Sequence, residues 1–264
     1  MCRVIIKKSC LELLIFVREN VPVLRDVLIF NNSVLYEKRS NLILFLLCAV
    51  IFIFCGCSTY RVIKDATDHE EGRLIMKDGT EYVGRVKMPN GKTKKLRMRT
   101  TDGRKVKVQN TEVGVLGVWK KTHPETVSFL VCHPYYTIAP FSTKKKKKMK
   151  PRWMSLEATG KYVEFYALGA NYSINSKGVF KVSSSIYITY LARKAGEEYA
   201  VEVGVYGGNK EYMRKQLMEY LSDDPALCSL IEDNEIEPDD FSELADKYRP
   251  QNSENMEEFP KMNL

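Results

Sequence analysis

Hydrophobic and polar residues alternate along much of the chain between residues 72 and 206, with the two-residue period typical of half-buried β-strands. The first four predicted strands cover residues 73–77, 82–88, 96–99 and 106–108. Asp-Gly or Asn-Gly pairs stand between them, at residues 78–79, 90–91 and 102–103. Such pairs favour tight turns, so the pattern predicts an antiparallel meander.

The same alternation predicts which side chains of the meander face the core. We expect five of them to be buried: Val83, Leu96, Met98, Val106 and Val108. The intervening positions are basic, and four are expected to point outward: Arg97, Arg99, Lys105 and Lys107. One face of this sheet should therefore be apolar and the other strongly basic.

Further apolar segments, rich in aromatic and β-branched residues, predict more strands downstream. They cover residues 112–119, 126–132, 153–156, 162–168, 179–183, 186–192 and 199–203. His133-Pro134 is expected to end the second of these strands. The run Lys144–Lys150 interrupts the pattern, and because like charges repel each other we expect a solvated loop there.

After Gly207-Gly208 the period changes to that of a helix, with Met213, Leu217, Tyr220 and Leu221 on one stripe. Asp224 and Pro225 predict the start of a second helix. Pro238 and Asp239 open a third, whose inward residues would be Phe241, Leu244 and Tyr248. The expected fold is α+β and mainly β: an antiparallel β-sandwich or small barrel-like sheet (72–206), a helical segment (207–249) and a disordered tail (250–264).

An apolar run from Leu42 to Cys57 follows Lys38 and Arg39. It is shorter than the roughly 20 residues that span a bilayer, so residues 38–56 have the layout of a secretory signal. Its end resembles a bacterial lipobox, in which a small residue, here Gly56, precedes a cysteine that is acylated and becomes the new N-terminus. Cys57 would be that lipidated, palmitate-bearing residue; the alternative is an uncleaved signal anchor.

Residues 1–37 precede this signal, although the charged n-region of a signal peptide normally stands at the start of the chain. Either they form a long n-region, or translation starts near Val34 or Leu35, whose codons can serve as alternative bacterial starts. In both cases we expect the mature protein to begin at Cys57, followed by a polar tether over residues 57–71. Of its remaining cysteines, Cys132 and Cys228 are expected to be buried thiols rather than a disulfide.

Charge is divided unevenly along the mature chain. Residues 57–218 contain 31 Lys and Arg against 15 Asp and Glu, whereas residues 219–264 contain 3 against 14. We expect the acidic helices partly to neutralise the basic sheet, leaving the lysine run as the outward positive surface. Its candidate contacts with anionic headgroups or an anionic envelope polymer are Lys144, Lys145, Lys146, Lys147, Lys148 and Lys150. The alternative is a merely solvated loop; no nucleic acid partner is expected.

The sequence contains few residues that are candidates for catalysis. His69 is expected in the tether and His123 in a surface turn, while Cys132 and His133 are neighbours in a predicted strand and should point to opposite faces. No Gly-x-Ser-x-Gly, His-Glu-x-x-His or phosphate-binding glycine loop occurs in the sequence. We therefore predict no catalytic residues, no metal site and no cofactor.

Two regions resemble a group of secreted or lipid-anchored bacterial envelope proteins. The matching residues are Lys77-Asp78-Gly79 with Gly84-Arg85, then Tyr220-Leu221, Asp223-Asp224-Pro225-Ala226-Leu227 and Tyr248. The resemblance implies a β-rich body with a helical C-terminal segment and brings no catalytic residues. Together with the lipobox and the lack of catalytic motifs, it supports our leading hypothesis, a non-enzymatic lipoprotein anchored in the cell envelope, with the outer membrane favoured. The alternatives are a binding module for an anionic glycan or lipid, and a hydrolase-type enzyme with an unrecognised site.

Overall fold

The computed structural model describes residues 69–138, 146–251 and 253–259. The signal segment, Gly56 and Cys57 lie outside these ranges. The strands are β1 (His69–Met76), β2 (Glu81–Lys87), β3 (Lys95–Thr100), β4 (Lys105–Gln109), β5 (Val113–Lys120), β6 (His123–Ile138), β7 (Lys146–Thr159), β8 (Val163–Leu168), β9 (Asn171–Ile174), β10 (Phe180–Ser183), β11 (Thr189–Lys194) and β12 (Ala200–Val205). The helices are α4 (Lys210–Tyr220), α5 (Pro225–Glu232) and α6 (Phe241–Lys247), followed by a 3-10 turn, Ser253–Asn255.

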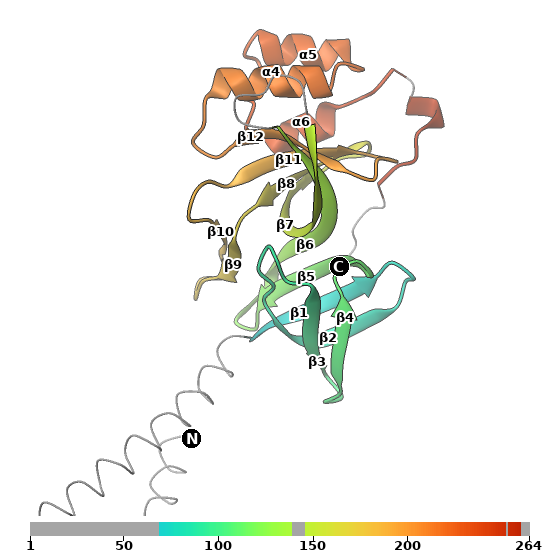
Figure 1. Ribbon diagram of the computed structural model, residues 1–264, viewed down its shortest axis with the longest axis vertical. Helices are drawn as coiled ribbons and strands as arrows, with labels where there is room; N and C mark the ends of the chain where they lie inside the picture. Colours follow the sequence, from blue (N-terminus) through green and yellow to red (C-terminus); the bar gives the residue numbers. More distant parts are fainter. Residues whose placement is uncertain (1–68, 139–145, 252, 260–264) are drawn as a thin grey trace, which may run out of the picture. The chain divides into compact units, whose positions relative to one another are not determined.

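Ten of these strands form one mixed sheet in the order β12-β11-β8-β7-β6-β5-β1-β2-β3-β4. A parallel pairing of β12 with β6, through Ala200↔Tyr135 and Val201↔Tyr136, closes the first five strands into a partial ring. The remaining strands continue from β6 as an antiparallel extension (Figure 1). The mainly β, barrel-like sheet followed by helices is thus confirmed.

The meander of β1–β4 follows the predicted turn signals. Gly79 and Gly103 have φ angles of 85° and 87°, which L-residues other than glycine rarely adopt. The Asp78 carboxylate accepts a hydrogen bond of 2.9 Å from the amide of Thr80 and so stabilises the first turn. Strand β1 begins at His69, so His69, Glu70 and Glu71 belong to the sheet and not to the predicted tether.

Strand β6 continues through Pro134, where the sequence predicted that it would end. The register with β7 shifts between His133 and Tyr135, which leaves the proline at a bulge where its missing N–H costs no ladder hydrogen bond. The β6–β7 hairpin extends to Ile138↔Lys146. The predicted loop over the lysine run is therefore wrong from Lys146 onward, because pairing with β6 holds these residues in a strand.

Three apolar clusters fill the structure. One lies under the meander and includes Leu74, Val86, Leu116 and Trp153, all 0% exposed. A second lies within the ring, and a third joins the sheet to the helices. Because these clusters lie within one compact unit, Lys64–Leu264, a fragment with these limits contains complete hydrophobic cores and is expected to fold independently.

The helices follow the predicted stripe and the predicted start of α5, whereas α6 begins at Phe241 with Asp240, not Pro238 or Asp239, as its N-cap. Leu217 and Leu244 are 0% exposed, and the Asp224 side chain accepts a hydrogen bond from the amide of Leu227, with Pro225 at the first helical position. Helix α4 packs on β12, and α6 packs on β7 and β8 (Figure 1). Within the described ranges, no helix has both the length and the apolar character needed to cross a bilayer.

The segment after Pro250 contacts the body, contrary to the disorder that we predicted from its polar composition. The amide of Phe259 donates a hydrogen bond of 3.0 Å to the carbonyl of Lys161. The Lys161 ammonium also forms a 2.7 Å ion pair with Glu258, and Met256 packs against the helical cluster. These contacts hold Met256, Glu258 and Phe259 against the body.

Candidate functional site

The meander presents a basic face to solvent. Val86, Leu96 and Met98 are at most 4% exposed on its inner side. The alternate positions are exposed and basic, and we call this set the basic face: Arg85, Lys87, Lys95, Arg97, Arg99, Lys105 and Lys107. The four outward residues predicted from the sequence belong to it.

The prediction for Val83 is wrong, since this side chain is 44% exposed. Val83 and Val86 are three residues apart and cannot share a face of one strand. Val86 packs in the core, and Gly84 occupies the next inward position, where a Cβ atom would lie 2.2 Å from the carbonyl oxygen of Arg99. The close approach of β3 therefore fixes the orientation of β2.

Strand register places cations of the basic face directly opposite each other. Arg99 lies between Arg85 on β2 and Lys105 on β4, and Arg97 pairs with Lys107. Like charges in directly opposed positions destabilise a sheet. Within the described part of the chain, no acidic side chain forms an ion pair with Arg97, Arg99, Lys105 or Lys107. The face thus retains an electrostatic cost that an external anion would relieve.

Protection of a sheet edge explains only part of this face. Strand β4 is the last strand of the sheet, and lysines on such a strand discourage pairing with other chains. That account covers Lys105 and Lys107. Arg97 and Arg99 lie on β3, which is paired on both sides. Their positions favour recognition of an anion instead.

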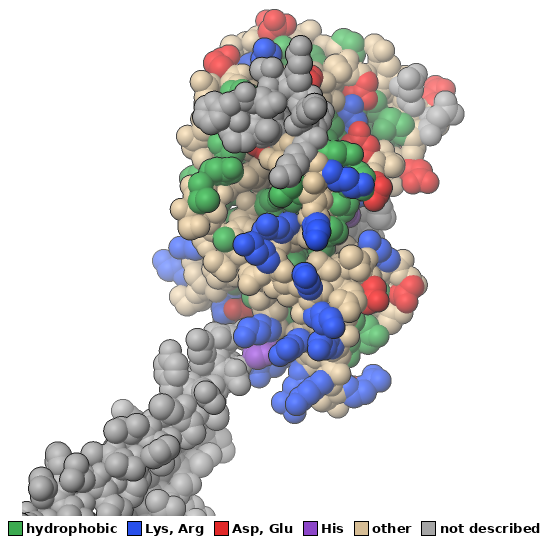
Figure 2. All heavy atoms as spheres, viewed as in Figure 1, with side chains coloured by type: hydrophobic (Ala, Val, Ile, Leu, Met, Phe, Trp, Pro, Cys, Tyr) green, Lys and Arg blue, Asp and Glu red, His purple; other side chains and the backbone are tan. Residues whose placement is uncertain are grey.

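The acidic helical segment and tail form ion pairs with Lys194 and Lys161 of the β-rich body, in line with the predicted partial neutralisation of the sheet, but the described ion pairs do not reach the basic face. The other ion pairs of the helical segment lie within it and involve Lys210, Arg214 and Lys247. Figure 2 shows Lys and Arg gathered over the meander end of the described region, while Asp and Glu dominate the helical end. On the face shown, the basic residues of the meander are therefore separate from the acidic residues of the helical end.

The predicted lysine contacts are only partly described. Lys144 and Lys145 lie outside the described residues, and Lys146 and Lys147 are described only as backbone in β7. Lys148 and Lys150 are exposed. The Lys148 ammonium lies 4.2 Å from the centroid of the Tyr199 ring, so this lysine packs on the ring at the seam between β12 and β6.

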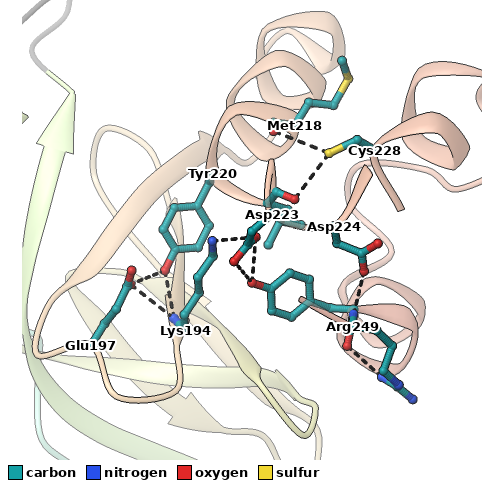
Figure 3. A network of polar contacts seen from close by, with 10 residues as sticks. Lys194, Glu197, Met218, Tyr220, Asp223, Asp224, Cys228 and Arg249 are labelled. Atoms are coloured by element: carbon teal, nitrogen blue, oxygen red, sulfur yellow. Dashed lines mark hydrogen bonds and ion pairs between the residues drawn. The ribbon is translucent and has the colours of Figure 1, made fainter. Parts of the chain in front are cut away.

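A polar network joins the helices to strand β11 (Figure 3). The Asp223 carboxylate accepts hydrogen bonds from the Tyr248 hydroxyl, at 2.8 and 2.9 Å, and from the Lys194 ammonium, at 2.8 Å. The Tyr220 hydroxyl donates to Glu197 at 2.5 Å and accepts from the Lys194 amide at 2.8 Å. Burial, reinforced by Asp223, raises the pKa of Tyr248 far above its usual range, so the phenol stays a donor. This network docks the helices.

Sequence reasoning missed a buried ion pair. Glu164 on β8 and Arg193 on β11 are directly opposed in register, and their side chains meet at 2.8 Å. The Tyr166 hydroxyl donates to the same carboxylate and accepts a 2.9 Å hydrogen bond from Arg193 Nε. A glutamate inside the apolar stretch Tyr162–Leu168 is the one local signal that could have indicated this cluster.

Cys132 and His133 do not act as a pair. Cys132 packs in the cluster under the meander, while the His133 ring lies 5.8 Å from that of Tyr166. Burial raises the pKa of the Cys132 thiol to about 11. Burial, with the positive charges of Arg193 and Lys77, lowers the pKa of His133 to about 3. At neutral pH both groups are uncharged.

Among the described residues, the other ionisable candidates lie on separate elements. His69 lies in β1, and His123 Nδ1 lies 3.2 Å from a Glu125 carboxylate oxygen at the surface. Cys132 and Cys228 are free thiols, as predicted, but only Cys132 is buried and Cys228 is half-buried. A cavity of about 450 Å³ is lined by Glu157, Glu237, Asp239, Asp240, Phe241 and Ser242. In the described ranges, no group of three or more His, Cys, Asp or Glu side chains is arranged to hold a metal ion.

Comparisons with known proteins leave the function to be argued from this geometry. No protein-family model, no curated protein and no solved structure matches the chain.

Proposed function

We propose that the chain is a non-enzymatic, lipid-anchored protein of the bacterial cell envelope whose basic face binds an anionic ligand. The observation that carries the proposal is the cross-strand opposition of Arg99 with Lys105 and of Arg97 with Lys107. Folding alone does not favour such pairs, and an anion placed over them would reduce their repulsion. A contiguous cationic stripe on the sheet is also what separates a binding module from a purely structural scaffold.

The binding test uses the fragment Lys64–Leu264. Replacing Arg97, Arg99 and Lys107 together by serine should weaken binding to vesicles containing phosphatidylglycerol, or to a soluble polyuronate, by ~100-fold. This follows from a contribution of about 1 kcal/mol for each basic residue near an anionic surface. The dissociation constant should also rise steeply with salt for the unmodified fragment, because exposed charges are screened over ~8 Å at physiological ionic strength.

The matched control carries the same change in net charge at exposed lysines elsewhere, with Lys177, Lys181 and Lys215 replaced by serine. It should bind nearly as tightly as the unmodified fragment, and both variants should keep its melting temperature. Equal loss of binding by the two triple variants would show that only net charge matters. That result would rule out the basic face as a site.

The anchor is tested separately at Cys57. Replacing Cys57 by serine should abolish acylation and leave the full chain unprocessed, because the thiol is the group that takes the lipid. Cys55→Ser is the control, since the residue before it, Phe54, is bulky rather than small. Mass spectrometry of the mature N-terminus from membranes decides the outcome, and an acylated, processed Cys57→Ser protein would refute the anchor.

A further inference from the structure

We propose that the ligand of the basic face is the headgroup layer of an anionic phospholipid membrane, and that the face orients the domain against it. This inference rests on the proposed function and assigns the chemistry of its ligand. The shared chemistry of the candidate ligands is a dense array of phosphates or carboxylates. The geometry of the face, its side-chain composition and its place in the chain favour a lipid surface over a soluble polymer.

The cations form a two-dimensional array and not a single track. Arg99 lies beside Lys105 and Arg97 lies beside Lys107 on the adjacent strands β3 and β4, which are spaced about 4.8 Å apart. Lys95, Arg97 and Arg99 follow one another along β3, at alternate residues spaced about 7 Å apart. A membrane presents anions over a plane and can approach all of these positions together. An extended polymer follows one row and leaves the others unneutralised.

The face offers charge without features that recognise a shape. On β3 and β4 the exposed side chains are Lys95, Arg97, Arg99, Lys105, Lys107 and Gln109, none of which has an aromatic ring on which a sugar or a base could stack. Two cavities of the described region are lined by residues of other elements, one by Glu157 and α6 and the other by Arg193 and the tail. Ligand sites for discrete small molecules are usually concave. Clusters of four to eight basic residues without such features are typical of proteins that bind anionic lipid.

The chain enters the domain at this same face. His69, the first described residue, is opposite Lys87 in register, and Glu71 is opposite Arg85. The segment that precedes His69 in the sequence begins, by our proposal, at a lipid-bearing Cys57. Fully extended, residues 57–68 span at most roughly 40 Å. A membrane that holds the lipid is therefore within reach of the edge of the basic face, which raises the effective concentration of headgroups there.

The test compares three probes with the fragment Lys64–Leu264: vesicles of phosphatidylcholine with phosphatidylglycerol, vesicles of phosphatidylcholine alone, and a soluble polyuronate at the same total charge. We expect the dissociation constant for the anionic vesicles to be at least 10-fold lower than for the polyuronate, and no measurable binding to neutral vesicles. Single replacements of Lys95, Arg97, Lys105 and Lys107 by serine should each weaken vesicle binding by a similar factor of about 3 to 5.

The outcomes separate this inference from the proposed function. Tighter binding to the polyuronate than to anionic vesicles would overturn the lipid assignment and leave an anion-binding face. Losses confined to one row of cations would likewise indicate a linear ligand. Failure to bind either anionic probe would overturn both proposals. For the control variant with Lys177, Lys181 and Lys215 replaced by serine, the dissociation constant for anionic vesicles should rise by less than 3-fold.

Discussion

Replacement of Arg193 by leucine is expected to lower the free energy of unfolding by about 3–5 kcal/mol, the usual cost of breaking a buried ion pair. The Glu164 carboxylate would lose its 2.8 Å partner while its side chain remains only 8% exposed. The Tyr166 hydroxyl would also lose the hydrogen bond that it accepts from Arg193. Urea unfolding at neutral pH measures the change directly.

A second variant distinguishes the destabilisation caused by the unpaired Glu164 charge from the destabilisation caused by lost packing of Arg193. Replacing Glu164 by glutamine in the Arg193→Leu background removes the isolated carboxylate and should recover a large part of the lost stability. The matched control is Arg104→Leu, which breaks an exposed pair with Asp102 and should cost less than about 1 kcal/mol. If Arg193→Leu cost no more than Arg104→Leu, the buried pair would contribute nothing to stability.

Local signals in the sequence were sufficient for the turns and helices. Asp78-Gly79 and Asp102-Gly103 specify tight turns through residues that tolerate positive φ, and Asp224-Pro225 specifies a helix start. These local interactions join residues at most four positions apart, so they can be predicted without the rest of the chain. The inward positions of Leu96 and Met98 also follow from alternation alone.

Features that depend on strand pairing could not be predicted in this way. Pro134 normally ends a strand, but here the bulge between β6 and β7 accommodates it. Self-repulsion of the lysine run predicted a loop, whereas pairing with β6 extends β7 to Lys146. Closure of the ring depends on only two residue pairs between β12 and β6, which are far apart in sequence.

In the candidate site, too, some features follow from the local sequence and others depend on strand pairing. Alternation predicted that Arg97 and Lys107 face outward, but only the register shows that they are opposed. The charge count predicted that the acidic helices would partly neutralise the sheet, but it could not show that the sheet residue paired with Asp223 would be Lys194 on β11 and not a residue of the meander. A count of charges along a chain therefore predicts that a basic region exists, and strand pairing determines whether its charges form one surface.

Acidification is expected to destabilise the fold through His133. Its pKa is about 3 in the folded protein, compared with about 6.5 for an unfolded chain. Between these values the unfolded chain binds a proton that the folded protein does not, so stability falls as the pH falls. The loss amounts to about 1.4 kcal/mol for each pH unit, or roughly 3 kcal/mol between pH 6.5 and pH 4.

The replacement His133→Gln removes this titration and should flatten the pH dependence of unfolding over the same window. The physical cause is desolvation of the ring, to which the charges of Arg193 and Lys77 add. Glu164 and Tyr166 lie in the same cluster and are unchanged in this variant, so their contribution remains in both measurements. His123→Gln, at a partly exposed position beside Glu125, is the matched control and should retain the wild-type slope. Urea titrations at pH 6.5, 5.5, 4.5 and 4 test the difference. Identical slopes for His133→Gln and the unmodified protein would contradict it, because removing a half-buried imidazole with a depressed pKa also removes its linkage to pH.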